Sequence, residues 1–355
     1  MDTALGNVWS MVRSWATQNA SQYITKTIPR ERTDLSGPDA PLVPYRDYLR
    51  LWLDDMFLSS SRSWFTDLYP AVHSAIELKF GTDPIKISHV TDGSGQIGRG
   101  SYGSYALTDL IPFNGGTVTI QSALVALKGT NYASAAIGIL KDFSGLVAAP
   151  LGQSLAIAEK VSAGLQSMFQ KGNEGVVLGF HRQYAAEGGG GGAVLVPGYF
   201  AVILATDNDI NPEGLSVKDS KLLYSKGGGT PKLLEGYEYM LFRIEGRSER
   251  DNWRMANIEE PLNQAIQATL QGQAETAKGY LTAALLIIWQ SPDLAVKDRR
   301  RVADAIKAEL AEVANQPNQA VASDLPTLDS IMLRHARSPN IAFHEPDLTL
   351  EEILA

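Results

Sequence analysis

The sequence contains no cysteine among its 355 residues. This absence excludes disulfide bonds, thiolate nucleophiles, zinc sites built on thiolates and lipid anchors attached through cysteine. Histidine is scarce as well, and none of its five copies stands in the H-E-x-x-H spacing of a zinc enzyme. They are His73, His89, His181, His335 and His344. A cysteine-free chain suits the cytoplasm, which is the location we predict.

An excess of positive charge is also missing. The chain has 31 Lys and Arg against 39 Asp and Glu, for a formal net charge of −8. Nucleic-acid binding needs clustered Lys and Arg to neutralise phosphates, so we expect no nucleic-acid partner. The basic run is "KDRRR" at residues 297–301, within a helical pattern. It predicts a solvated helix face or, alternatively, an anion-binding patch.

Long apolar runs are absent too. No stretch approaches 18 uninterrupted apolar residues, so we expect no ordinary membrane-spanning helix. Residues 1–20 lack the basic start and apolar run of a secretory signal, and their pattern is that of an amphipathic helix. Residues 131–170 are rich in Ala and Gly and predict two helices, which pack across a sheet or, alternatively, associate with a membrane.

Alternating apolar and polar residues dominate the middle of the chain. Residues 71–80 alternate in this way, and further strands are expected at 85–90, 115–129, 175–185, 193–207, 215–225 and 237–247. Several connecting loops are rich in Gly or Asp and Asn and are too short to hold a crossover helix, which favours antiparallel neighbours. We therefore predict an α+β fold with a mostly antiparallel β-sandwich, or a barrel-like closure of the same strands.

The pattern divides the chain into four parts. We expect N-terminal helices and a linker over 1–69, the sandwich with its helical insertion over 70–250, a C-terminal helical unit over 251–314, and an irregular tail over 315–355. Within the first part, residues 44–58 place Trp52, Met56 and Phe57 on one helical face. This face is expected to dock on the core or on another protein.

Two motifs suggest chemistry but stand in the wrong context. Gly93, Gly95 and Gly98 have the spacing of a dinucleotide-binding loop, yet no crossover helix follows them, so we expect an ordinary loop. Ser154 in "GQSLA" approaches a nucleophile elbow, but closely spaced strands follow instead of alternating strands and helices. A serine hydrolase that uses Ser154 is therefore kept only as an alternative.

The segment "TDNDINPEG" offers oxygen ligands at alternate positions. They are Asp207, Asp209, Asn211 and Glu213, and hard oxygen donors at this spacing suit Ca²⁺. The segment is not an EF-hand, because Pro212 stands where that loop needs Gly. A polar turn is the alternative interpretation. No other cofactor is expected.

The last residues, "DLTLEEILA", predict a short amphipathic helical turn. Thr349 and Glu352 stand in capping-box relation, and Leu350, Ile353 and Leu354 supply an apolar side. Such a segment on a tail is typical of a docking peptide, although it can also pack back on its own domain. With no catalytic constellation found, we predict a bacterial-type accessory or adaptor protein that acts through contacts with a protein partner. The alternative is a calcium- or lipid-responsive module that associates with a membrane.

Overall fold

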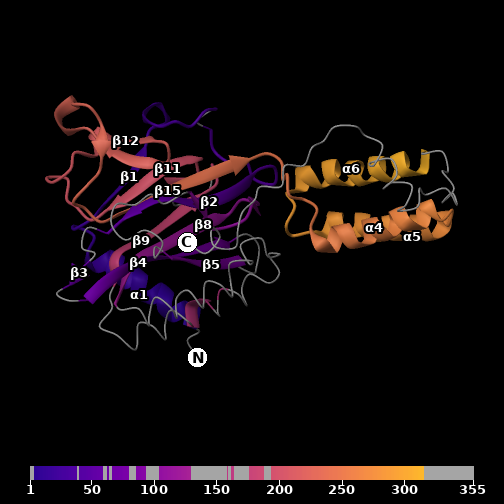
Figure 1. Cartoon of the computed structure of the whole chain (residues 1–355), viewed down its shortest axis with the longest axis horizontal. Coiled ribbons are helices and arrows are strands. Elements are labelled where there is room, and N and C mark those ends of the chain that lie inside the picture. The colour runs from indigo at the N-terminus through magenta and orange to yellow at the C-terminus, as the bar shows by residue number, and fades with distance from the viewer. Residues whose placement is uncertain are drawn as a thin grey trace, which may run out of the picture.

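The computed structural model describes residues 4–37, 40–58, 62–63, 66–79, 85–92, 104–128, 158, 161–163, 176–187 and 193–315. The fold is α+β with antiparallel sheets, as the sequence predicts. Figure 1 shows the sheets gathered at one end of the molecule and a unit of helices at the other. The glycine-rich loop from Gly93, Ser154 and the tail from residue 316 lie outside the described residues.

The first sheet has the strand order β1-β11-β15-β2-β6, and β7 also pairs with β2. Its strands are β1 (Ile24–Ile28), β2 (Tyr48–Phe57), β6 (Tyr105–Ala106), β7 (Ile111–Pro112), β11 (Gly198–Ile203) and β15 (Tyr239–Arg247). All of these neighbours run antiparallel. The register between β15 and β2 shifts between Leu241 and Phe242. Both β1 and β2 precede residue 70, so the sandwich takes in two segments that the sequence analysis places before it.

The second sheet has the order β10-β9-β8-β4-β3, and β5 also pairs with β4. Its strands are β3 (Arg62–Ser63), β4 (Thr66–Lys79), β5 (Ile85–Asp92), β8 (Thr117–Lys128), β9 (Val176–Ala185) and β10 (Ala193–Val194). The short β10 runs parallel to β9, whereas the other pairs are antiparallel. The strands expected at 71–80, 85–90, 115–129 and 175–185 are therefore confirmed.

The main hydrophobic core lies between these two sheets. Phe180 from the second sheet packs on Phe200 and Phe242 from the first, with its ring centroid 5.2 Å and 6.3 Å from theirs. Burying one such side chain stabilises the fold by roughly 1.5–3 kcal/mol. Helix α1 (Ala4–Gln18) covers the outer face of the second sheet, where Gly179 leaves room for the ring of Trp15. The amphipathic helix expected at the start of the chain is confirmed.

A third layer covers the outer face of the first sheet. It consists of β12 (Leu215–Lys218), β13 (Lys221–Tyr224) and β14 (Lys232–Leu233), together with the short 3-10 helices η1 (Arg30–Arg32), η3 (Pro212–Gly214) and η4 (Lys226–Gly228). Leu215, Val217 and Leu222 of this layer form a second apolar cluster with Tyr199 and Leu241 of the sheet. Much of the first sheet is therefore buried on both faces.

This double burial explains why residues 44–58 form a strand and not the helix predicted from their spacing. In "YLRLWLDDMF" both faces carry apolar side chains, because one face meets the main core and the other partly meets the third layer. The register shift that skips Asp54 also puts Leu53 and Met56, three residues apart, on the same core face, which imitates the spacing of a helix. The helix prediction for this segment is wrong.

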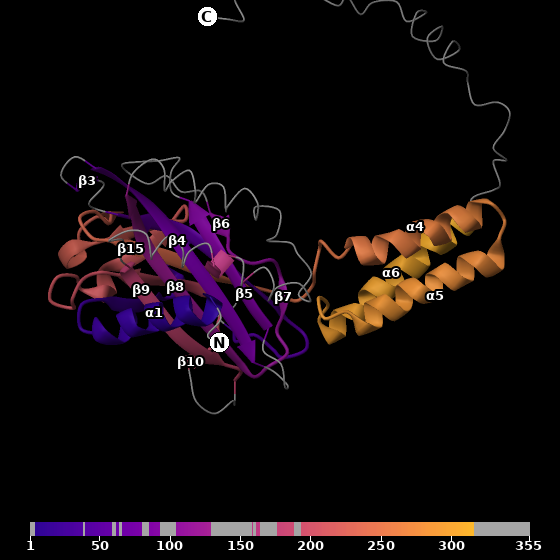
Figure 2. The ribbon, with the colours of Figure 1, turned by 90° about the horizontal axis from the view of Figure 1, so that it is seen from below.

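The C-terminal unit contains α4 (Ala256–Leu270), α5 (Ala274–Gln290) and α6 (Val296–Asn315), which confirms the three helices expected there. Ile258, Leu262, Ile288, Val302 and Ile306 form its own apolar cluster. In both views the three helices lie side by side at one end of the sandwich (Figures 1 and 2). No helix among the described residues combines the length and the apolar character needed to cross a membrane.

Candidate functional site

The outer face of α5 is exposed although it is apolar. From residue 279 to its end at Gln290 the helix carries no charged side chain. Ala284 and Ile288 are buried against the other two helices, whereas Leu286 is 55% and Trp289 is 48% exposed. A helix that is apolar around its circumference is normally buried on all sides. This exposed half of α5 is therefore a candidate contact surface.

The exposed side chains form one continuous stripe. Lys278, Thr282, Leu286 and Trp289 follow one another at spacings of four, four and three residues, which places them on the same side of a helix. Gly279 adjoins this stripe, and no atom lies within 4 Å of the position that a Cβ would take there. We call Lys278, Gly279, Thr282, Leu286 and Trp289 the α5 face.

A cation without an acidic partner stands at each end of the α5 face. At the C-terminal end the Arg299 guanidinium donates to the carbonyl oxygens of Trp289 (2.7 Å), Ser291 (2.8 Å) and Leu294 (3.2 Å). Its charge thus lies where the helix macrodipole is negative. In the described part of the chain no carboxylate forms a salt bridge with Arg299, and the same holds for Lys278. The surface is therefore apolar in the middle and positive at both ends.

A buried polar cluster attaches the helical unit to the sandwich. Asp298, at the start of α6, is 2% exposed and accepts hydrogen bonds from the Tyr48 hydroxyl (2.8 Å) and the Arg250 backbone NH (3.0 Å). Arg301 donates to the same carboxylate at 2.5 Å and to the Arg250 carbonyl at 2.7 Å. Burial raises the pKa of the Tyr48 hydroxyl, so this group stays protonated and donates to Asp298.

Arg250 continues this cluster into the first sheet. Its guanidinium forms a salt bridge with Asp109 and donates to the carbonyl oxygens of Leu110 (2.8 Å) and Asp293 (3.2 Å). Arg50 on β2 bonds the same Asp109 at 3.1 Å. Because these contacts join β2, the 104–110 segment and the start of α6, the α5 face is held in a fixed place relative to the sandwich.

The structure does not present Trp52, Met56 and Phe57 as one docking face. Trp52 donates from its ring nitrogen to Glu245 at 2.7 Å, and the Arg243 guanidinium lies 4.7 Å from its ring centroid. Met56 belongs to the main core and is 3% exposed, while Phe57 stacks on Tyr239. In place of the expected helical face there is a strand, whose side chains point alternately to the two sides of the sheet. The other partner-binding residues predicted, Leu350, Ile353 and Leu354, lie outside the described residues.

Three of the four expected calcium ligands, Asp209, Asn211 and Glu213, have hydrogen-bond partners within the protein. Asp209 accepts from the NH and hydroxyl of Thr206, and Asn211 caps η3 by accepting from the Glu213 NH. The hydrogen bonds and charges of Lys26 and Arg32 lower the pKa of Glu213. No third acidic or histidine side chain completes a metal-binding group anywhere among the described residues. The loop therefore has the hydrogen bonds of a polar turn.

Sequence reasoning missed the α5 face for a physical reason. The run "LTAALLIIWQ" predicts a helix correctly, but its apolar residues occupy every side, so the sequence does not indicate which side meets α4 and α6. The sequence did contain one indication of this surface, because residues 279–290 carry no charged side chain over three helical turns. Comparison of the chain with protein-family models, with curated proteins and with solved structures found no match. The geometry of the described residues therefore carries the functional argument.

Proposed function

We propose that the chain is an adaptor protein that binds other proteins through the α5 face, and that its ligand is a short amphipathic helix with acidic side chains. The observation that carries this proposal is the pairing of two exposed large apolar side chains, Leu286 and Trp289, with an unpaired cation at each end. An amphipathic helix that binds through its apolar face to an apolar surface is a common mode of peptide recognition.

The charge of the surface argues for an acidic ligand. Arg299 and Lys278 lack carboxylate partners in the described part of the chain, so a ligand that brings carboxylates gains charge complementarity at both ends. A ligand without acidic groups would leave both cations unpaired. Trp289 supports the choice of this surface as a binding site, because Trp is enriched among the residues that dominate binding energy.

The chain itself supplies one segment of this kind. Residues 347–355 combine Leu350, Ile353 and Leu354 with three acidic residues, Asp347, Glu351 and Glu352. We infer that this segment occupies the α5 face of its own chain, and that a protein partner with the same chemistry binds by displacing it. The adaptor prediction and the docking-peptide prediction then describe two sides of one contact.

The test is a titration with a synthetic peptide of residues 345–355. A fluorescent version is added to the chain shortened after residue 315, which retains every described helix and strand, and its anisotropy is followed. We expect binding with a Kd of about 1–100 μM. Leu286→Asp and Trp289→Ala should each weaken binding by about tenfold or more, because each removes an apolar side chain that the bound peptide would bury.

Leu233→Asp is the matched control, because Leu233 is also apolar and 53% exposed but lies on β14 in the third layer. It should leave the Kd unchanged. A second peptide, with Glu351 and Glu352 replaced by Gln, should bind more weakly and with less dependence on salt. Binding that Leu286→Asp and Trp289→Ala leave unaltered would refute the proposed surface.

A further inference from the structure

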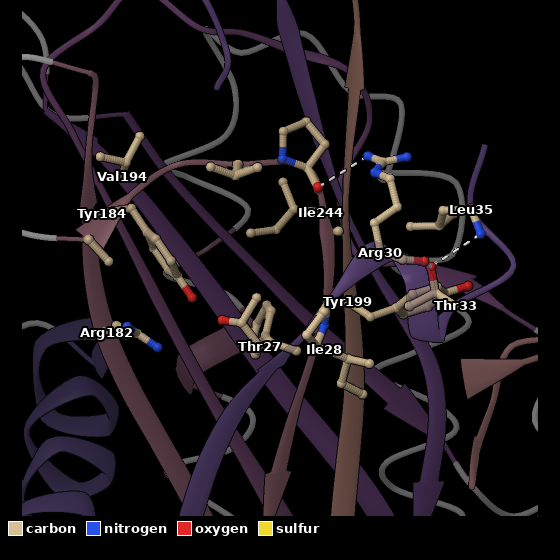
Figure 3. Close-up of a pocket in the computed structure, with 16 residues that line it drawn as sticks. Thr27, Ile28, Arg30, Thr33, Leu35, Arg182, Tyr184, Val194, Tyr199 and Ile244 are labelled. Carbon is tan, nitrogen blue, oxygen red and sulfur yellow. Dashed lines mark hydrogen bonds between the residues drawn. The ribbon is translucent and has the colours of Figure 1, made fainter. Parts of the chain in front are cut away.

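A cavity of about 150 Å³ opens at the edge of the sandwich (Figure 3). One wall comes from the end of β1 and the residues after it, including Thr27, Ile28 and Arg30. The opposite wall comes from β9 and β10, with Arg182, Tyr184 and Val194. Because β1 and β10 are the edge strands of their sheets, the cavity lies where the two sheets are open to each other.

The lining is positive and otherwise apolar. Arg30 and Arg182 are its charged residues, and no Asp or Glu lines it. Most of the remaining surface is apolar, from Ile28, Leu35, Val194, Val196, Pro197 and Ile244. A ligand that fills this space therefore needs a negative group and an apolar body.

The polar groups of the cavity have unused hydrogen-bonding capacity. Tyr184 is 6% exposed, and its hydroxyl makes no hydrogen bond to any described residue. The Arg182 guanidinium lies 5.5 Å from the Tyr184 ring centroid and has neither an ion pair nor a side-chain hydrogen bond within the described part of the chain. Figure 3 shows the Tyr184 hydroxyl pointing toward the side of the cavity that holds Arg182 and Thr27. Because both groups line the cavity and neither is bonded to another described group, they can donate to an acceptor that enters it.

Arg30 closes the other end of the cavity. It donates from Nη1 to the Ser36 carbonyl at 2.7 Å and from Nη2 to the Pro197 carbonyl at 3.4 Å, while its buried Nε has no partner. These contacts fix the guanidinium in place without neutralising it, because both acceptors are uncharged carbonyls. Burial raises the pKa of the Tyr184 hydroxyl to about 12, so this hydroxyl stays protonated near neutral pH and remains a donor.

From this arrangement we infer that the cavity binds a small organic carboxylate, whose carboxylate accepts hydrogen bonds from Arg182 and Tyr184 and whose apolar body lies against Ile28, Val194 and Ile244. The size limits the ligand, since a cavity of roughly 150 Å³ holds one benzene molecule. The ligand is therefore about as large as benzoate. This site is independent of the α5 face, and neither proposal depends on the other.

The test uses the full chain and isothermal titration with sodium benzoate. We expect a Kd at or below about 1 mM, and binding of the neutral analogue benzyl alcohol weaker by about tenfold or more. Arg182→Gln should weaken benzoate binding by about tenfold or more, because it removes a charge-assisted hydrogen bond. Tyr184→Phe should weaken it by about threefold to tenfold without loss of stability, since its hydroxyl has no bonded partner in the described protein to lose.

Arg300→Gln is the matched control, because the side chain of Arg300 is 84% exposed on α6 and should not affect the Kd. The inference is overturned if benzoate does not bind below about 10 mM, or if Arg182→Gln and Tyr184→Phe both leave its Kd unchanged. Tighter binding of inorganic phosphate than of benzoate would also overturn it, because the apolar lining would then contribute nothing. Weak or no binding of phosphate supports the assignment.

Discussion

At the scale of single residues, one carboxylate joins the two halves of the molecule. Asp298 accepts from the side chains of Tyr48 and Arg301 and from the Arg250 backbone. Because Tyr48 and Arg250 are buried, the Tyr48 hydroxyl and the Arg250 NH cannot turn to water if this carboxylate is removed. In the sequence, Asp298 looks like an ordinary acidic residue in the first turn of a helix. Its partner Tyr48 lies 250 residues away, and only the fold brings the two together.

We expect Asp298→Ala to lower the free energy of unfolding by about 2–5 kcal/mol, because it leaves the buried Tyr48 hydroxyl and the buried Arg250 backbone NH without their acceptor. Urea denaturation checks this. Asp304→Ala is the control, since Asp304 lies six residues further along the same helix and its side chain is 61% exposed. It should change stability by less than about 0.5 kcal/mol. Equal losses of unfolding free energy for the two substitutions would mean that the hydrogen bonds of Asp298 do not stabilise the fold.

The lowered pKa of His181 should make the folded protein less stable in acid. Burial and the nearby charge of Arg13 lower its pKa below the ordinary value of 6.5, although Glu77 opposes this. The folded chain then binds fewer protons than the unfolded chain, so stability is fully present above 6.5 and falls as the pH drops below it. His181→Gln should therefore reduce the difference in unfolding free energy between about pH 7.5 and about pH 5.

Arg13→Gln provides the complementary measurement. By removing the repelling charge it should raise the pKa of His181, which can be read from an NMR titration of the ring protons. If His181→Gln left the acid slope as steep as before, other groups would be responsible for it.

At the scale of elements, two glycines should respond oppositely to the same substitution. A Cβ on Gly179 in β9 would lie 2.7 Å from Cε3 of Trp15, whereas nothing lies within 4 Å of one on Gly279 in α5. Gly179→Ala should therefore destabilise the protein by about 1–3 kcal/mol by pushing α1 off the sheet. Gly279→Ala should stabilise it by about 0.5–1 kcal/mol, because alanine favours a helix interior. Thermal melts of both variants check the pair, and a common direction of change would contradict this packing.

The elements also show where sequence reasoning succeeds and where it stops. The strand over 71–80 was predictable because β4 has an apolar side toward the main core and a different environment on its other side. β2 was not predictable in this way, because its register shift puts Leu53 and Met56, three residues apart, on the core face and so imitates a helical spacing. The positive charge at the end of α5 could not be predicted either. It belongs to Arg299 in the run "KDRRR" of α6, and the turn before α6 places this residue beside Trp289.

At the scale of the whole molecule, the chain that follows α6 has enough residues to reach the α5 face. α6 has 20 residues and is about 30 Å long, and Arg299 shows that Trp289 lies at its beginning. The 31 residues from 316 to 346 can reach about 100 Å at full extension, which exceeds this distance. Segment 347–355 is thus within reach of the α5 face of its own chain, where its tether makes it an intramolecular competitor of a free ligand.

Removal of residues 316–355 should therefore raise the affinity for the free peptide of residues 345–355 by about tenfold or more, because the tethered competitor is gone. Ile353→Asp with Leu354→Asp in the full chain should give a similar gain, which separates loss of the segment from shortening of the chain. Anisotropy titrations of the three proteins make the comparison. An equal affinity in all of them would show that the segment does not occupy the face.

The most direct measurement uses the absence of cysteine, because two introduced thiols then have no competitors. The full chain with Leu286→Cys and Ile353→Cys is compared under mild oxidation with a chain that has Ala308→Cys and Ile353→Cys. Residue 308 is exposed on α6 and lies closer along the chain to residue 353, so random collisions would favour its disulfide. Our account predicts that the 286–353 disulfide forms faster and within one chain. Faster formation of the 308–353 disulfide would contradict it.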